Sequence, residues 1–294
     1  MATASEWVEG ARPRTLPAAI APIAVGTGAA AAADGLRPAL ALLALIVMLA
    51  AQVGVNYAND YSDGVRGTDR ERVGPVRLVG QGLASASQVR LAAIASLAVC
   101  ALAGLAIVVI TGQWWLLLVG AAALAAAWLY TGGPKPYGYL GLGEIFVFVF
   151  FGIVPVVGTA YIQALRFTTA AWVSSLGVGA VICAILVANN LRDIPTDATV
   201  GKRTLAVRLG DRGTRILYVV LVVSAFAVIP PMAVPHGLGL TYAWLGVLAL
   251  PLAIRPVMAV SRGAAGRALI PVLQGTGLLT LGYGLLLGLG LALS

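Results

Sequence analysis

The first group of side chains able to do chemistry lies between residues 56 and 63. Asn56, Asp60 and Asp63 are spaced i, i+4 and i+7, which places them on one face of a helix, and Asn59 lies beside them. The apolar run that leads into this group ends near residue 58. We therefore expect a helix that presents a stripe of amide and carboxylate oxygens where it ends.

A second stripe of the same composition lies between residues 189 and 197. Asn189, Asp193 and Asp197 are spaced i, i+4 and i+8. Pro195 lies between the two carboxylates, and because proline lacks the backbone N–H and clashes with the preceding turn, we expect no regular helix through Asp197. The sequence thus predicts oxygen donors at the ends of two different helices.

Donor sets made only of carboxylate and amide oxygens are typical of sites for hard cations, with Mg²⁺ preferred over transition metals. Mg²⁺ is usually bound through one or two carboxylates and completes its shell with water and substrate phosphates, so the two stripes could hold two ions that bridge a diphosphate. Arg and Lys of the adjoining loops would neutralise the remaining phosphate charge. Two other interpretations stay open: solvated helix ends, or a Na⁺ or H⁺ site of a secondary transporter.

The same sequence excludes several other classes of site. The only histidine, His236, lies in a Pro/Gly loop, which excludes Ser-His-Asp catalysis and zinc sites built on histidine. Cys100 and Cys183 both lie in apolar runs and are interpreted as core residues, not as a disulfide. The net charge of +8 comes from Arg and Lys in short loops, which favours membrane orientation over a nucleic-acid partner.

Membrane-spanning helices must position these side chains. Of the 294 residues, 60% are hydrophobic and 10% are charged, whereas soluble domains carry roughly 25% charged residues. Apolar runs of about 20 residues recur from end to end, which predicts an all-α, polytopic membrane protein. We expect a single domain over residues 1–294. Nine spanning helices are predicted, near residues 15–33, 38–58, 88–111, 114–131, 143–163, 171–191, 213–234, 240–260 and 268–292.

The distribution of positive charge predicts the orientation of these nine helices. If the N-terminus and the loops after the even-numbered helices share one side, that side holds 17 of the 19 Lys and Arg residues, and only Arg37 and Arg166 lie opposite. The positive-inside rule then places the N-terminus in the cytoplasm and the C-terminus outside. Both Asn/Asp stripes lie at cytoplasmic helix ends, so we expect a site that faces the cytoplasm.

Four stretches of the chain resemble the UbiA superfamily of intramembrane aromatic prenyltransferases. They are residues 11–17 (Ala-Arg-Pro-Arg-Thr-Leu-Pro), 56–77, 130–144 and 189–210. The superfamily carries two aspartate-rich motifs, after helices 2 and 6 of a nine-helix bundle, which correspond here to residues 56–69 and 189–197. The motifs are most similar to the branch that prenylates 1,4-dihydroxy-2-naphthoate in menaquinone synthesis, and the likeness extends over about residues 7–215.

The resemblance also implies roles for individual residues. It implies that Asn59, Asp60 and Asp63 of the first motif, with Asp193 and Asp197 of the second, bind a polyprenyl diphosphate through Mg²⁺. Further substrate-binding residues are implied at Asn56, Arg66, Arg72, Lys135, Asn189, Lys202 and Arg203.

The implied reaction transfers the polyprenyl group to the naphthalenediol ring, with loss of the ring carboxylate as CO₂ and formation of demethylmenaquinol. Mg²⁺ and cations would stabilise charge on the departing diphosphate, and the ring face of Tyr130 would stabilise the allylic cation. Two alternatives stay open: another aromatic acceptor such as 4-hydroxybenzoate, and an ion-coupled secondary transporter. The protein is expected in the cytoplasmic membrane, surrounded by membrane lipid.

Overall fold

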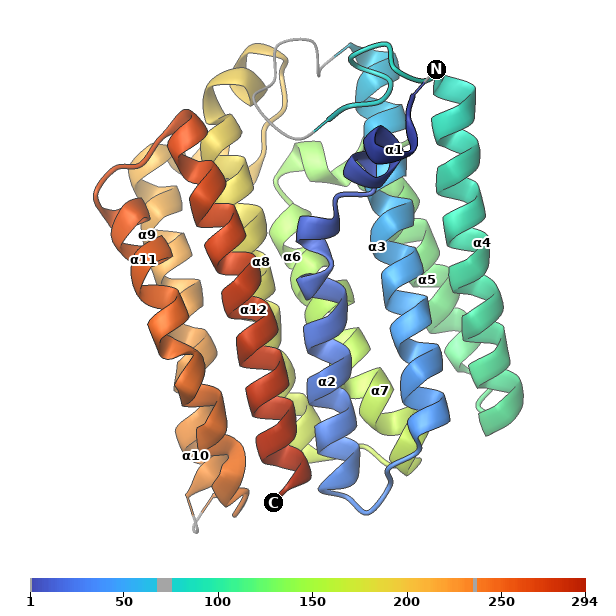
Figure 1. Cartoon of the computed structure of the whole chain (residues 1–294), viewed down its shortest axis with the longest axis vertical. Coiled ribbons are helices and arrows are strands. Elements are labelled where there is room, and N and C mark those ends of the chain that lie inside the picture. The colour runs from blue at the N-terminus through green and yellow to red at the C-terminus, as the bar shows by residue number, and fades with distance from the viewer. Residues whose placement is uncertain (1, 68–75, 235–236) are drawn as a thin grey trace.

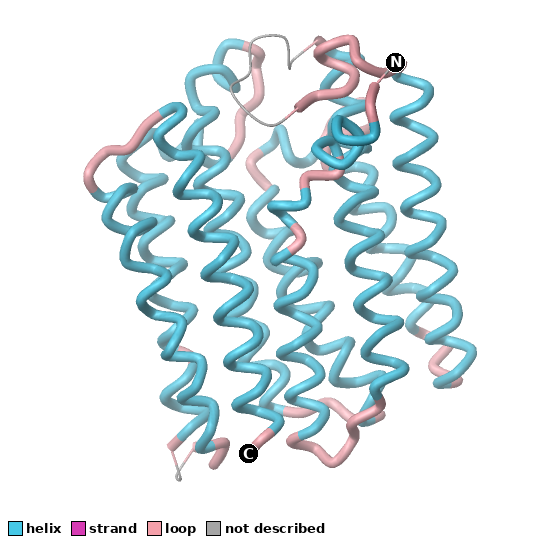
Figure 2. Tube along the Cα trace, viewed as in Figure 1, coloured by secondary structure: helices cyan, strands magenta, loops and turns pink. Residues whose placement is uncertain are grey.

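The described part of the chain, residues 2–67, 76–234 and 237–294 of a computed structural model, is a bundle of helices without strands (Figure 2). The two termini lie at opposite ends of the bundle (Figure 1). The prediction of an all-α fold is confirmed. In chain order the described elements are α1 Ala4–Gly10, η1 Pro13–Thr15, α2 Pro17–Ala31, α3 Pro38–Arg66, α4 Ala86–Thr111, α5 Leu116–Leu129, η2 Tyr137–Leu140, α6 Gly143–Val147, η3 Phe148–Ile153, α7 Val154–Ala164, α8 Thr169–Thr199, α9 Leu205–Ala227, α10 Ile229–Ala233, η4 Thr241–Ala249, α11 Leu250–Ser261, η5 Gly266–Ala268 and α12 Leu269–Ala292.

The segments predicted from hydropathy fall on helical residues of the described chain. Among the described residues, seven helical segments are long and apolar enough to cross a membrane. Two more, α2 and α5, are apolar but shorter. The count of nine membrane crossings and the cytoplasmic position of the N-terminus stay predictions.

The helix that carries the first Asn/Asp stripe, α3, is longer than predicted. Hydropathy predicts its end near residue 58, but the helix continues to Arg66 and is closed by Gly67, whose φ of 72° is the left-handed conformation that glycine adopts readily. The polar end of α3 therefore belongs to the helix, and the whole stripe is held on regular helical backbone.

The helix that carries the second stripe, α8, continues through Pro195 to Thr199, so the expected break before Asp197 is wrong. Two bonds support the turn that proline weakens. The Thr196 hydroxyl donates to the carbonyl of Asp193 at 3.0 Å, and the backbone N–H of Lys202 donates to the Asp197 carbonyl at 2.9 Å. Asp197 is thereby held in the last turns of a continuous helix.

A π-helical turn, η3, interrupts the segment that hydropathy predicts as one regular helix over 143–163. The turn packs against α8 at a point where a Cβ on Gly152 would lie 2.4 Å from the Cα of Gly179. π-turns are rare, and they occur frequently at functional sites. Here the turn places Phe150 and Phe151 beside the two cavities described below.

The α2 and α12 helices lie side by side in the bundle (Figure 1) and approach each other closely. A Cβ on Gly28 would lie 2.0 Å from the backbone oxygen of Gly288, and a Cβ on Gly288 would lie 2.5 Å from the backbone oxygen of Ala24. In a membrane, such close backbone approach between small residues is a main source of helix association. The contact fixes α2 against α12 below the site.

We expect Gly28→Val to lower the melting temperature of the detergent-solubilised protein, because the added atoms would force α2 and α12 apart. Overpacking of this kind typically costs about 1–3 kcal/mol. Gly120→Val on α5 is the matched control, since nothing lies within 4 Å of a Cβ at that position. Tryptophan fluorescence during heating measures the melting temperatures. Equal values for the two variants would contradict this packing.

Candidate active site

A polar cavity of about 570 Å³ lies at the end of the bundle that carries the N-terminus and α1 (Figure 1). Its walls come from the segment 9–18, α3, the loop after α5, α8 and α12. The predicted site residues that line it are Asn56, Asn59, Asp63, Tyr130, Asn189, Asp197 and Lys202. The predicted site residues that do not line it are Asp60, Arg66, Lys135, Asp193 and Arg203, and Arg72 lies outside the described residues.

Asp63 is the centre of a buried charged cluster. Its Oδ2 lies 3.2 Å from the Nζ of Lys202, and its Oδ1 accepts a hydrogen bond from the hydroxyl of Tyr139. Lys202 also lies 4.6 Å from the centre of the Tyr139 ring. The side chains of Lys202 and Asp63 are 5% and 4% exposed. Because Lys202 follows α8, this cluster brings the ends of the two motif-bearing helices to one wall of the cavity.

The two asparagines of the first motif hold neighbouring segments in place. The Oδ1 of Asn59 accepts a hydrogen bond from the Thr131 hydroxyl at 2.8 Å. The Nδ2 of Asn56 donates to the backbone oxygen of Ala11 at 2.9 Å and to Oγ1 of Thr15 at 3.0 Å. Asn59 thus fixes the loop after α5, and Asn56 fixes the N-terminal segment, while both side chains line the cavity.

Asp60, the central carboxylate of the first motif, contacts a different part of the chain. Its Oδ2 accepts from the backbone N–H of Leu78 at 2.7 Å, and its Oδ1 accepts from the N–H of Val79 at 3.2 Å. The residue is 1% exposed. Asp60 therefore holds the segment that follows the first motif, and the structure does not bring it to the cavity wall with Asp63.

The carboxylates of the second motif are divided in the same way. Arg192 donates to both oxygens of Asp193, through Nε at 2.7 Å and Nη2 at 2.8 Å, and its Nη2 also donates to Oδ1 of Asn189 at 2.8 Å. Asp197 lines the cavity and is 4% exposed. In each motif one carboxylate lines the cavity and another is hydrogen-bonded to neighbouring protein groups.

The cavity carries more positive charge than the sequence predicts. Arg12, Arg14, Arg77 and Arg192 line it together with Lys202. Counting charge by loops treats these arginines only as cations that orient the protein. The resemblance could have indicated that these arginines belong to the site, because residues 11–17 and 56–77 lie in the stretches that resemble the superfamily.

The other predicted phosphate ligands occupy the periphery. Arg66 donates through its guanidinium to the backbone carbonyls of Thr131 and Gly133, so it ties the end of α3 to the loop after α5. Lys135 and Arg203 are exposed. Neither side chain reaches the cavity wall in this structure.

The donors at the cavity suit a hard divalent cation that binds together with its substrate. Asp63 and Asp197 offer carboxylates, and Asn59 and Asn189 offer amide oxygens. Within the described ranges, no three His, Cys, Asp or Glu side chains are grouped so that they could hold a metal ion. Mg²⁺ commonly binds through one or two carboxylates plus substrate phosphates, so the residues present fit that ion.

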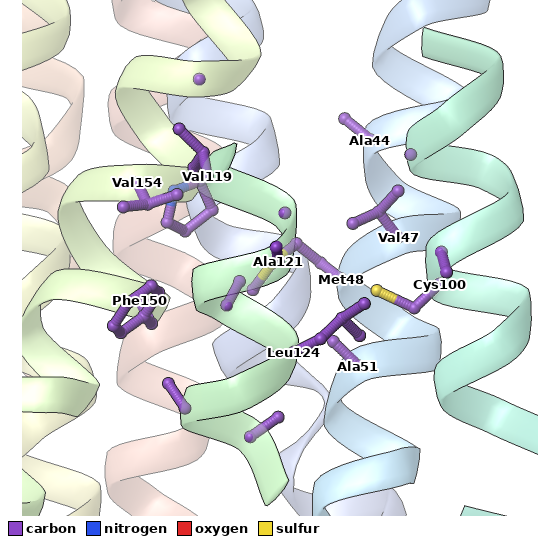
Figure 3. A pocket seen from close by; sticks show the side chains of 18 of the residues that line it. Ala44, Val47, Met48, Ala51, Cys100, Val119, Ala121, Leu124, Phe150 and Val154 are labelled. Carbon is purple, nitrogen blue, oxygen red and sulfur yellow. The ribbon is translucent and has the colours of Figure 1, made fainter. Parts of the chain in front are cut away.

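An apolar cavity of about 440 Å³ adjoins the polar one (Figure 3). Its walls come from α3, α4, α5 and the helical segment Gly143–Ala164. Val55, Tyr130, Val147 and Phe151 line both cavities. The polar cavity therefore continues into an apolar groove, and Tyr130 stands at the junction.

The comparisons with known proteins agree with this arrangement. The sequence matches the UbiA prenyltransferase family over residues 19–269. It is 54% identical to the 1,4-dihydroxy-2-naphthoate octaprenyltransferase of Mycobacterium tuberculosis, over 97% of this chain and 96% of that protein. It is 37% identical to the Escherichia coli protein of the same name, over 98% of this chain and 95% of that protein.

Solved structures of UbiA homologues share the fold. A homologue from Aeropyrum pernix superimposes with a TM-score of 0.68 at 17% identity, covering 92% of this chain and 96% of that chain. A homologue from Archaeoglobus fulgidus, solved with GPP and Mg²⁺, gives a TM-score of 0.64 at 16% identity and covers 95% and 98% of the two chains. The fold, the family match and the long full-length identities show that the chain belongs to the UbiA prenyltransferase family.

Proposed function

We propose that the protein transfers a polyprenyl group from polyprenyl diphosphate to 1,4-dihydroxy-2-naphthoate, with loss of CO₂, and so forms demethylmenaquinol for menaquinone synthesis. The observation that carries the proposal is the junction of an acidic and basic cavity with an apolar groove. A polyprenyl diphosphate has the same division into a charged head and an apolar chain. The names of the relatives indicate the acceptor.

The head of the substrate would be bound by both motifs. Asp63 and Asp197, with the amide oxygens of Asn59 and Asn189, would hold Mg²⁺. We propose two ions, one at each motif, which supply Lewis acidity to the departing diphosphate. Asp60 and Asp193 would act indirectly, since their bonds hold the backbone after the first motif and the Arg192 guanidinium.

The protein's own cations would complete the neutralisation of the diphosphate. Lys202 and Arg192 line the cavity beside the carboxylates, and Arg77 lines the same cavity. Charged donors that are already in place stabilise charge on a leaving group at no reorganisation cost. Arg66, Lys135 and Arg203 lie farther out and would meet substrate only as it enters.

The allylic carbon would lie where the two cavities meet. Tyr130 lines both, and the negative face of an aromatic ring stabilises a nearby cation. The ring carbon that bears the carboxylate would then attack the allylic cation. The bond from this carbon to the carboxylate breaks, CO₂ leaves, and its electron pair restores the aromatic ring without an external base. The chain beyond the allylic carbon would occupy the groove among α3, α4 and α5.

The proposed setting is the cytoplasmic membrane, with the cavity facing the cytoplasm. Support comes from the excess of Arg and Lys in the loops on the side of the N-terminus, which by the positive-inside rule is the cytoplasmic side. The cavity lies at the same end of the bundle as the N-terminus.

The direct test uses purified protein in detergent with Mg²⁺, a polyprenyl diphosphate and carboxyl-labelled 1,4-dihydroxy-2-naphthoate. We expect prenylated quinol and one CO₂ per product, both lost when the metal is chelated. If product forms from 4-hydroxybenzoate and not from the naphthoate, the proposed acceptor is wrong, whereas the proposed role of the diphosphate and Mg²⁺ stands. No product and no diphosphate release with either acceptor would contradict the proposal.

We expect Gly158→Leu to discriminate between long and short prenyl substrates. Gly158 lines the apolar groove, and nothing lies within 4 Å of a Cβ there, so a leucine side chain can start from this position without a clash at its Cβ and extend into the groove. Displacing two methylenes of the chain would reduce kcat/KM for geranylgeranyl diphosphate about tenfold, at about 0.8 kcal/mol each. The value for dimethylallyl diphosphate should stay unchanged.

The matched control for this variant is Ala122→Leu on α5, an exposed position that does not line the groove. If Gly158→Leu leaves the ratio of kcat/KM for the two prenyl diphosphates as in the control, the chain does not follow this groove.

A further inference from the structure

One buried acid beside the polar cavity takes no part in the chemistry proposed for the diphosphate. Glu144, at the start of the helical segment Gly143–Ala164, is 8% exposed and lines neither cavity. Within the described ranges it forms no ion pair with a lysine or an arginine. A carboxylate among apolar helices is costly to bury, and such residues are usually functional. The groups that Glu144 contacts therefore indicate its role.

The side chain of Glu144 is hydrogen-bonded to an amide of the helix that carries the second motif. Its Oε1 accepts from Nδ2 of Asn190, on α8, at 2.9 Å. Asn190 is 7% exposed and lines the polar cavity, and its Oδ1 accepts no hydrogen bond from the described residues. Because a carboxylate can only accept, it holds the amide nitrogen on its own side and leaves the amide oxygen for the cavity.

The turn that carries Glu144 also supports Tyr130, whose side chain lines both cavities. A Cβ on Gly143 would lie 3.3 Å from Cε2 of the Tyr130 ring and 3.5 Å from Cδ2 of Leu186. Leu186 precedes Asn190 by about one turn of α8. One turn of the chain thus holds the Asn190 amide and the Tyr130 ring beside the junction of the two cavities.

We propose that Glu144 is a positioning residue for the ionisation of the prenyl diphosphate. It holds the Asn190 amide so that an oxygen, and not an NH₂ group, faces the allylic carbon beside the Tyr130 ring. When the bond between C1 and the bridging oxygen breaks, its electron pair leaves with the diphosphate and C1 becomes positive. An oxygen dipole fixed beside C1 stabilises this charge, whereas an NH₂ group would oppose it. The inference rests on the proposed function.

The test compares three variants of the pair. In Glu144→Gln the new amide can donate as well as accept, so the Asn190 amide is free to turn over. Asn190→Ala removes the amide. The combination of Glu144→Gln with Asn190→Asp exchanges donor and acceptor: the new amide donates to one oxygen of the new carboxylate, and the other oxygen faces the cavity. The net charge of this exchanged pair equals that of the original pair.

The matched control is Cys183→Ala, at the same contact between α8 and the start of α6. Sγ of Cys183 donates to the backbone oxygen of Glu144 at 3.2 Å. Cys183 is 2% exposed and lines neither cavity. The control therefore weakens the packing contact without touching the amide that faces the cavity.

We expect kcat for prenyl transfer to fall about tenfold in Glu144→Gln and about a hundredfold in Asn190→Ala. The KM for both substrates should stay within about twofold, because the oxygen acts on charge that develops only in the transition state. The exchanged pair should recover most of kcat, and the control should keep it. Added to Asn190→Ala, Glu144→Gln should have no further effect, because it acts only through that amide.

Ionisation is also measured without an acceptor. The probe is geranyl diphosphate with heavy oxygen in the bridge to C1. Reversible breaking of that bond moves the label to the other oxygens of the same phosphate, which phosphorus NMR detects. The rate of this exchange should fall in both single variants and return in the exchanged pair.

The outcomes separate this inference from the proposed function. If the unsubstituted protein prenylates the naphthoate and Glu144→Gln keeps its kcat, the inference is wrong and the proposed function stands. If no acceptor is prenylated but label exchange occurs and falls in Glu144→Gln, the inference stands and the proposed acceptor fails. If Glu144→Gln raises only the half-saturating Mg²⁺ concentration, the oxygen faces the metal and the inference is wrong. An equal loss of kcat in Cys183→Ala would also overturn it, because the contact would then be structural.

Discussion

Asp63→Asn is expected to reduce kcat about a thousandfold, corresponding to ~4 kcal/mol of transition-state stabilisation. Asp63 lines the cavity from α3, and in the proposed function its carboxylate would bind Mg²⁺. Asparagine can keep the oxygen that accepts from the Tyr139 hydroxyl, but its amide nitrogen replaces the oxygen beside Lys202. The variant therefore loses the charge that would attract the metal and also some stability, because Lys202 stays buried without its partner. Asp197→Asn, which changes the cavity-lining carboxylate of α8, should behave in the same way.

The measurement is single-turnover prenyl transfer at saturating substrate, with the folded fraction of each variant taken from gel filtration in the same detergent. Asp211→Asn is the control, because Asp211 is an acid on α9 whose side chain is 63% exposed and pairs with Arg215. Loss of a residue that only positions a ligand typically costs about tenfold or more. If Asp63→Asn keeps more than about a tenth of the activity, Asp63 is therefore not a metal ligand.

Helical spacing predicts which residues share a face, but it does not predict the partner of each residue. Asp60 and Asp63 are both at the polar end of α3, as the i, i+4 and i+7 pattern indicates. Yet Asp60 accepts from the backbone of Leu78 and Val79, whereas Asp63 is paired with Lys202. Those partners come from segments far along the chain, and their approach depends on tertiary packing that one sequence does not encode in any local pattern.

Hydropathy is a good predictor of helices in this protein and a poor predictor of their irregularities. Apolar runs locate the helical segments because a membrane requires about 20 apolar residues for each crossing. Pro195 is tolerated inside α8 because nearby bonds support its turn, and the π-turn η3 carries no hydropathy signal at all. Both irregularities lie beside the cavity, where local rules and function most often conflict.

The α12 wall of the cavity was also beyond the motifs. Ile270, Leu273 and Gln274 of α12 line the cavity but lie outside the stretch that resembles the superfamily, and the packing of α12 beside α8 exists only in the folded bundle. Arg14 is the exception, since it lies in a matching stretch, but counting charge by loops assigns it to membrane orientation. Conflicting signals for one residue were resolved only by its position on the cavity wall.

Lys202→Met is expected to lower the free energy of unfolding by about 3 kcal/mol, the usual cost of leaving one charge of a buried pair without its partner. The Lys202 and Asp63 side chains are 5% and 4% exposed, and after the substitution only the Tyr139 hydroxyl among these groups would still bond the carboxylate. Thermal unfolding in detergent measures the effect. Arg203→Met, the exposed neighbour that does not line the cavity, is the control.

The double variant Asp63→Asn, Lys202→Met distinguishes a structural from a catalytic role for the pair. Removing both charges leaves no unpaired ion, so most of the lost stability should return, giving a coupling between the two sites on the order of 2 kcal/mol. Activity should not return, because the proposed carboxylate ligand of Mg²⁺ and the proposed cation for the diphosphate are both absent. Recovery of stability together with activity would mean that the pair only holds α3 to the end of α8. Recovery of stability alone would show that the fold buries a charge pair whose two members are needed for the chemistry.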